Sequence, residues 1–193
     1  MKYILFISLL FTSCSKNSES NSINEDESLA SETEQISSKN YEIYLLEQLN
    51  ENRGYCIDIK GSKLNADPDN GLQAHTCYSY QGEVSVDQGF DNVKIDEDEF
   101  YMPFFEVCME AENTSVSSIL KLKVCNKNVK QKFKFNSNEE IVLSDNTNLC
   151  LTVSENSREG GGGTPTHLIR DLILDNCSAD ISTRQRWGLR KAQ

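Results

Sequence analysis

The sequence predicts an all-β protein built from three copies of one structural unit. A triplet of glutamine, any residue and an aromatic residue occurs three times, and no stretch shows a helical period. The copies are Gln88-Gly89-Phe90, Gln131-Lys132-Phe133 and Gln185-Arg186-Trp187. Each triplet follows a cysteine by a few residues, and another cysteine precedes that one in a short apolar run. Such a repeat decides the fold class, because each unit buries its apolar face only against its neighbours.

Composition suggests one domain with accessory segments and argues against nucleic-acid binding. The 193 residues carry a net charge of −11. Residues 1–40 hold three lysines and six acids, which leaves 16 basic and 24 acidic residues, a net charge of −8, beyond residue 40. A phosphate backbone needs a basic surface, so we expect no nucleic-acid partner. The acidic run Asp96–Glu99 is interpreted as a solvated loop, with calcium binding as the less favoured alternative.

The N-terminus predicts export. A lysine at position 2 precedes the apolar run Tyr3–Phe11, whose nine residues are too short to cross a bilayer core of about 30 Å as a helix. The segment 1–14 is therefore interpreted as a signal peptide. It ends in Phe11-Thr12-Ser13-Cys14, which resembles the lipobox of bacterial lipoproteins, and this implies that Cys14 is lipidated.

The lipobox resemblance implies a lipid-anchored protein of the bacterial cell envelope, facing the surface or the periplasm. Ordinary secretory cleavage, which would make the protein extracellular, and an uncleaved anchor are the alternatives. Residues 15–40 contain eight serines and four asparagines with few apolar residues, so they predict a flexible tether.

From residue 41 onward, short apolar or alternating runs separated by turn residues predict β-strands. The expected strands are 42–46, 55–59, 71–77, 119–125, 141–143, 149–153 and 172–174. The segment 65–71 is dense in turn formers and is interpreted as a plain turn, because it lacks the distal glutamate of a calcium loop. The insertion 154–166 contains Gly160–Gly163, and we interpret it as a floppy surface loop, because no Lys-Ser/Thr follows to complete a phosphate site.

Seven cysteines in an exported chain predict disulfides. The repeat selects one pairing in which each bridge stays within its unit: Cys56–Cys77, Cys108–Cys125 and Cys150–Cys177. Cys14 is left over, which agrees with lipidation. We expect no metal or cofactor, because the chain has no Cys-x-x-Cys and its two histidines, His75 and His167, are isolated.

Three units with a cysteine followed by an acid-like position, a second cysteine and a Gln-x-Trp/Phe triplet resemble the ricin B-type lectin family. The resemblance covers residues 41–193. It implies a β-trefoil, in which three lobes of four short strands are related by a pseudo-threefold axis. The lobes would span about 41–91, 92–136 and 137–193. It also implies that Phe90, Phe133 and Trp187 belong to the core, where an aromatic ring buries a large apolar area.

Members of that family bind sugars in one pocket per lobe, and in this chain the first lobe matches best. The resemblance assigns the sugar-binding positions to Asp58, Gln73, His75, Asp87 and Gln88, with His75 as the stacking ring and Asp87-Gln88 where Asn-Gln is usual. A carboxylate and amides suit sugar hydroxyls, and a ring suits the apolar face of a galactose-type sugar.

Nearby and corresponding positions refine this assignment. Tyr78 and Tyr80 would add stacking surface to the first lobe. In the second lobe Glu110 replaces the acid, while Lys121 and Lys123 replace the glutamine and the aromatic residue. In the third lobe the corresponding replacements are Thr152, Ile173 and Asp175. Neither of these lobes is expected to bind sugar.

Several functions stay open at this point. The first is a lipid-anchored lectin whose partner is a galactose-type glycan. The second is a β-trefoil platform for a protein partner, such as a toxin-accessory or adhesion subunit, in which Asp58 only bonds Gln88 and stiffens the lobe. An enzyme is the least favoured: Asp58 and Asp87 could act as a glycosidase pair, but their family positions lie in a shallow pocket, and His75 lacks a nearby nucleophile.

Overall fold

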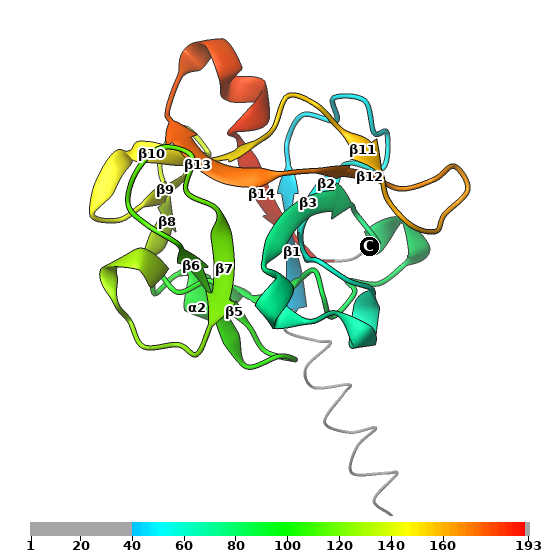
Figure 1. The fold of residues 1–193 in the computed structure, drawn as a ribbon, viewed down its shortest axis with the longest axis horizontal. Coiled ribbons are helices and arrows are strands. Elements are labelled where there is room, and N and C mark those ends of the chain that lie inside the picture. The colour runs from blue at the N-terminus through cyan, green and yellow to red at the C-terminus, as the bar shows by residue number, and fades with distance from the viewer. Residues whose placement is uncertain (1–39, 192–193) are drawn as a thin grey trace, which may run out of the picture.

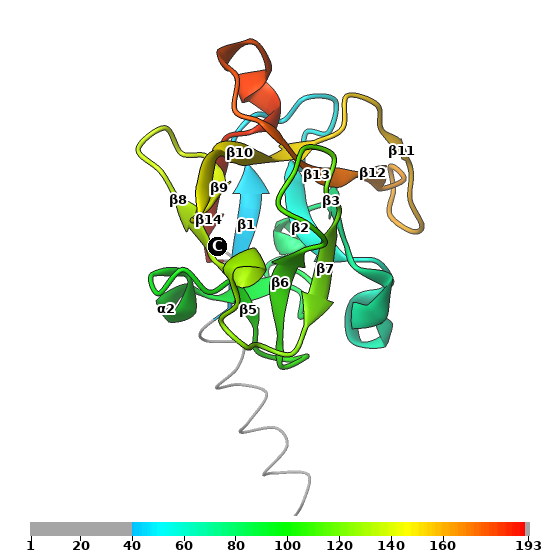
Figure 2. The same ribbon diagram turned by 60° about the vertical axis from the view of Figure 1, so that its left-hand side comes forward.

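A computed structural model describes residues 40–191. The predicted signal peptide with Cys14, and the predicted tether except for its last residue, lie outside this range. Asn40, assigned above to the tether, is instead the first residue of strand β1. The described chain forms three lobes of short strands around a common core, and Figures 1 and 2 show them side by side.

Each lobe contributes four strands, as expected of a β-trefoil. The first lobe consists of β1 (Asn40–Leu45), β2 (Tyr55–Ile59), β3 (Leu72–Thr76) and β4 (Gly89–Asp91). The second consists of β5 (Tyr101–Met102), β6 (Val107–Ala111), β7 (Leu120–Lys123) and β8 (Phe133–Phe135). The third consists of β9 (Ile141–Leu143), β10 (Asn146–Val153), β13 (Leu172–Asn176) and β14 (Trp187–Arg190).

Short helices occupy several connections between these strands. One α-helical turn, α2 (Asn92–Ile95), joins the first two lobes. The 3-10 turns are η1 (Lys63–Asn65), η2 (Pro68–Asn70), η3 (Ser79–Gln81), η4 (Val129–Gln131) and η5 (Ala179–Arg184). Among the residues described, no helix is both long and apolar enough to cross a membrane.

The strands form three antiparallel sheets. The largest has the order β11-β12-β3-β2-β1-β14, in which β11 is Arg158–Glu159 and β12 is Leu168–Arg170, and β4 also pairs with β1. The other two are β13-β10-β9-β8 and β5-β6-β7. Because β1 pairs with β14, the first and last strands of the domain close the structure.

The largest sheet contains two strands beyond the four per lobe that the family resemblance implies. They are β11 (Arg158–Glu159) and β12 (Leu168–Arg170), and they arise from the insertion between the third lobe's cysteines. β12 pairs with β3 of the first lobe, and both ribbon views place it there. The expectation of a surface loop at 154–166 is therefore only partly met: Arg158–Glu159 pair with β12, which is fixed to another lobe, while residues 161–166 form an exposed turn.

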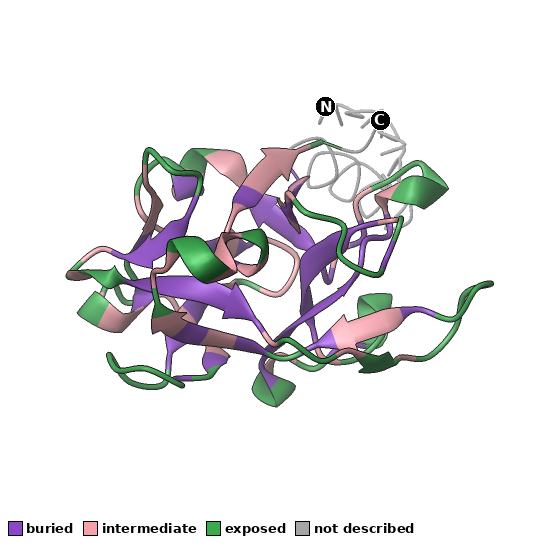
Figure 3. Ribbon diagram, turned by 90° about the horizontal axis from the view of Figure 1, so that it is seen from above, coloured by how far each residue is buried: buried purple, intermediate pink, exposed green. Residues whose placement is uncertain are grey.

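The aromatic residues of the triplets form the centre of the core, as predicted. Phe90, Phe133 and Trp187 are at most 1 % exposed. Trp187 Nε1 donates to the carbonyl of Leu151 at 2.9 Å, which satisfies its polar atom. Strands form the buried interior and connections cover the outside, as Figure 3 shows.

The glutamine of each triplet makes the same set of hydrogen bonds in its lobe. Its Oε1 accepts from the backbone amide that follows the second cysteine, at 2.8–2.9 Å. Its Nε2 donates to the carbonyl that precedes that cysteine, at 2.9–3.1 Å. Nε2 also donates to the side chain at the acid position, which is Asp58, Glu110 or Thr152. A buried amide with all these partners ties each lobe's strands to its last connection.

The three predicted disulfides are confirmed. Cys56–Cys77, Cys108–Cys125 and Cys150–Cys177 join Cα atoms 4.9–5.1 Å apart. Each closes a loop within one lobe, with separations of 21, 17 and 27 residues.

Candidate functional site

The β2–β3 hairpin brings the first two predicted sugar-binding residues together, because Asp58 pairs in register with Gln73. Asp58 is 1 % exposed. Its Oδ1 accepts from Gln73 Nε2 at 2.9 Å, and its Oδ2 accepts from Gln88 Nε2 at 3.0 Å. Burial, reinforced by the carboxylate of Asp87, raises the pKa of Asp58 well above its usual value. Asp58 thus serves mainly to hold two glutamines.

Asp87 holds a connecting segment. It is fully buried, and its two oxygens accept from the Ser85 hydroxyl and the backbone amide of Lys63. Lys63 has φ +49°, a left-handed conformation that is uncommon for a residue with a long side chain. Asp87 therefore fixes the backbone at the position from which the Lys63 side chain leaves.

His75 lies in a cluster of rings. Its Nδ1 lies 2.9 Å from the carbonyl of Thr76, which can only accept, so Nδ1 carries the proton. In the neutral ring Nε2 is then an acceptor, and it makes no hydrogen bond within residues 40–191. Burial lowers the pKa of His75 and keeps it neutral at physiological pH. The ring centroids of Tyr78 and His167 lie 5.2 and 5.1 Å away.

The β11–β12 hairpin of the third lobe, which extends beyond the insertion at 154–166, supplies His167 to this cluster. The pairing of Ile169 with His75 places the hairpin beside the first lobe. The amide of Leu168 donates to Thr76 Oγ1 at 2.8 Å. Tyr80 Oη lies 3.0 Å from His167 Nε2.

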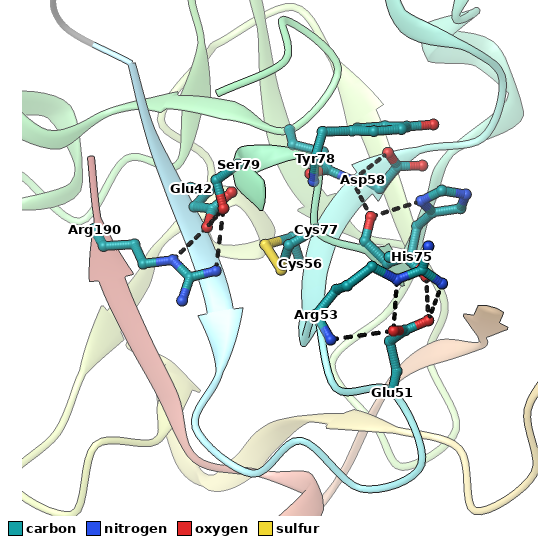
Figure 4. Close-up of a disulfide and its surroundings, with 12 residues drawn as sticks. Glu42, Glu51, Arg53, Cys56, Asp58, His75, Cys77, Tyr78, Ser79 and Arg190 are labelled. Atoms are coloured by element: carbon teal, nitrogen blue, oxygen red, sulfur yellow. Dashed lines mark hydrogen bonds and ion pairs between the residues drawn. A yellow bond between two sulfur atoms is a disulfide. The ribbon is translucent and has the colours of Figure 1, made fainter. Parts of the chain in front are cut away.

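Arg53 and Glu51 anchor the same hairpin from the loop before β2. Arg53 donates to the carbonyls of Pro165 and Thr166 at 2.9 and 3.0 Å, and to both oxygens of Glu51 at 2.7 Å. The hydrogen bonds from Arg53 and Thr76 lower the pKa of Glu51 to about 2. Figure 4 shows this pair on one side of the Cys56–Cys77 disulfide. On the other side lies the pair of the buried Glu42 with the partly exposed Arg190.

These elements enclose a pocket of about 470 Å³ between the first lobe and the insertion. Residues important for its chemistry are Lys63, Gln73, His75, Tyr78, His167 and Gly161–Gly163. Of the five predicted residues, Gln73 and His75 line the pocket, whereas Asp58, Asp87 and Gln88 are buried behind it. Tyr78 also lines it, and Tyr80 supports His167 from outside.

The sequence did not predict three parts of the pocket lining: Lys63, His167 and the glycine run. Gly163 has φ +76°, and a Cβ there would lie 2.5 Å from the His167 ring. The glycine therefore permits both the turn and the close approach of that ring. The signal in the sequence was the glycine run near a histidine, but only the β12–β3 pairing connects it with His75.

The family model of the ricin-type beta-trefoil lectin domain matches residues 46–187, which is more than half of the chain. The protein belongs to this family. Its matched segment includes all three triplets and all three disulfides.

Solved structures show the same fold. The designed threefold-symmetric protein ThreeFoil aligns with a TM-score of 0.56 and 16% identity, over 79% of this chain and 98% of that one. The earthworm R-type lectin C-half in complex with GalNAc aligns with a TM-score of 0.52 and 14% identity, over the same shares. An earthworm lectin C-terminal domain mutant in complex with 6'-sialyllactose aligns with a TM-score of 0.52 and 15% identity, over 79% of this chain and 98% of that one. No curated protein sequence matches the chain.

The other two lobes of this ricin-type domain use their acid positions differently. In the second, Glu110 accepts from Gln131 and Asn128 at 2.9 Å, and Lys130 lies 3.7 Å away. In the third, the Thr152 hydroxyl accepts from Gln185. A pocket of about 520 Å³ beside η5 contains none of the third lobe's family positions. The pocket of about 470 Å³, which the first lobe and the insertion of the third lobe form together, is the best candidate site and is called the composite pocket below.

Proposed function

We propose that this lectin domain binds a glycan, of galactose type, in the composite pocket of the first lobe. The observation that carries the proposal is a pair of free acceptors on the pocket wall. Gln73 must turn its nitrogen toward the Asp58 carboxylate, so its Oε1 is left for a ligand. His75 offers Nε2 beside it. Two acceptors next to aromatic rings suit vicinal hydroxyls on a sugar ring.

The binding of GalNAc and 6'-sialyllactose by the two earthworm lectin domains supports this proposal at the level of the fold. One pocket offers few contacts, so we expect a dissociation constant from high micromolar to millimolar, about −4 to −6 kcal/mol. The lining gives no support to a glycosidase, because Asp58 and Asp87 are buried and hydrogen-bonded rather than facing the cavity.

The direct test is saturation-transfer NMR with galactose and GalNAc, comparing Gly163→Ala with Gly82→Ala. An added Cβ at Gly163 meets the His167 ring, whereas one at Gly82, which also has a positive φ and lies outside the pocket, meets nothing within 4 Å. We expect about a tenfold loss of affinity for Gly163→Ala and unchanged affinity for Gly82→Ala, since about 1.4 kcal/mol of lost contact corresponds to tenfold.

Both glycines lie in exposed loops, so thermal unfolding should confirm that the two variants fold. A wild-type protein that binds neither these sugars nor any member of a glycan array would overturn the proposal and favour the protein-interaction platform. Equal binding by the two variants would show that a sugar occupies a different surface.

We also propose that the domain is lipid-anchored at the bacterial cell envelope. The lipobox-like run before Cys14 and the pairing of all other cysteines in disulfides support this. Mass spectrometry of the N-terminal peptide is expected to find lipid on Cys14, and a Cys14→Ser variant should leave the membrane fraction. Cleavage elsewhere with an unmodified Cys14 would contradict this proposal.

A further inference from the structure

The lining of the composite pocket carries no carboxylate, although the chain beyond residue 40 has a net charge of −8. Its titratable groups are Lys63, His75, His167 and Tyr78. Asp58 and Asp87, which lie behind this wall, are buried, and every one of their oxygens already accepts a hydrogen bond from the protein. The wall is therefore locally neutral or basic in an otherwise acidic protein.

Lys63 has a charge that no carboxylate of the described chain neutralises. Within residues 40–191, no carboxylate oxygen lies within 4 Å of its ammonium, which instead lies 3.5 Å from Gln81 Oε1 and 5.4 Å from the Tyr78 ring centroid. The left-handed backbone at Lys63 is held by the buried Asp87. Such a conformation costs about 1 kcal/mol and persists where the surroundings impose it. The fold thus positions a free cation at the pocket.

The glycine run Gly161–Gly163 lines the same cavity from the insertion. The amides of Gly162 and Gly163 donate to no acceptor within the described chain, and both residues are exposed. Lys63 therefore supplies the charge for an anionic group, while Gln73 Oε1 and His75 Nε2 accept from hydroxyls.

We propose that the pocket selects a sugar that carries a carboxylate, a hexuronic or sialic acid, with the carboxylate on Lys63 and the hydroxyls on Gln73 and His75. This inference rests on the proposed glycan binding at the same site. Lys63 is the specificity-determining residue. Asp87 is a positioning residue, because it touches the Lys63 backbone and not the ligand.

The test compares galactose with galacturonate, which differ only in a hydroxymethyl or carboxylate group at one carbon. Titration by NMR in low salt is expected to show galacturonate binding about fivefold tighter, the upper range for a partly exposed ion pair. The preference should shrink when salt is added, because Lys63 is exposed. Lys63→Gln should abolish the preference, so that the variant binds galactose and galacturonate with equal affinity.

Lys127→Gln is the matched control, because Lys127 is also exposed, also has a left-handed backbone (φ +59°) and lies outside the pocket. It should retain the preference. Galactose binding without a preference for galacturonate overturns this inference but not the proposed function, and so does a preference that survives Lys63→Gln. Failure of both sugars, and of every member of a glycan array, to bind overturns both.

Discussion

Replacing Gln88 by leucine is expected to lower the free energy of unfolding by about 4 kcal/mol, twice the loss expected for Gln185→Leu. Both glutamines are fully buried and make equivalent backbone hydrogen bonds. They differ in the third partner, which is the Asp58 carboxylate for Gln88 and the Thr152 hydroxyl for Gln185. Removing one partner of a buried charge lowers the free energy of unfolding by about 3–5 kcal/mol. Leaving a buried neutral group without its hydrogen bond lowers it by about 1–3 kcal/mol.

Urea unfolding at pH 7 and pH 5 measures both losses. The raised pKa of Asp58 means that the folded state binds its proton more tightly than the unfolded state does. The destabilisation caused by the buried charge therefore falls as the pH decreases. The deficit of Gln88→Leu should therefore be smaller at pH 5, while that of Gln185→Leu stays constant. Equal losses at both pH values would show that Asp58 is not a buried charge.

The second large effect is expected for Glu51→Gln, which should cost about 2–3 kcal/mol at pH 7. The pKa of Glu51 falls from 4.5 to about 2 on folding, and each pKa unit corresponds to about 1.4 kcal/mol. A lowered pKa stabilises the folded state above pH 4.5, and this contribution is lost as the pH falls toward 2. The difference between wild type and Glu51→Gln should therefore shrink across that window.

Glu139→Gln is the control, because Glu139 pairs with Arg186 at 2.5 Å but both side chains are exposed. Exposed pairs contribute about 0–1 kcal/mol. Chemical unfolding between pH 2 and pH 7 compares the two variants. Similar losses for both, or a Glu51→Gln deficit independent of pH, would contradict the role assigned to the Glu51–Arg53 pair.

The core and the cysteine framework were predictable because their signals are local and repeated. Each aromatic residue and each cysteine recurs at a similar place in three units, and Trp187 and Cys150–Cys177 lie where the pattern puts them. Strands such as 55–59 and 141–143 were predicted to the residue.

The composite pocket was not predictable, because it depends on a contact between distant segments. β11 and β12 have only two and three residues, too few for a periodic pattern. Their partner β3 lies in another lobe, so His167 looked isolated although it packs against His75. Of the family positions, Gln73 and His75 line the pocket. No motif marks Lys63, whose backbone is held by the Asp87 side chain, a residue that was expected to contact the sugar.

The pairing of β1 with β14 has a consequence for biosynthesis. It joins Ile43 to Leu189, so a strand synthesised near the start of the domain cannot pair fully until the last strand has been synthesised. A chain emerging from a ribosome or a translocon can close its first two disulfides early, but it cannot complete its barrel until the last lobe has emerged. Until then β1 has an unpaired edge open to other strands, and a chaperone is expected to engage the nascent domain there.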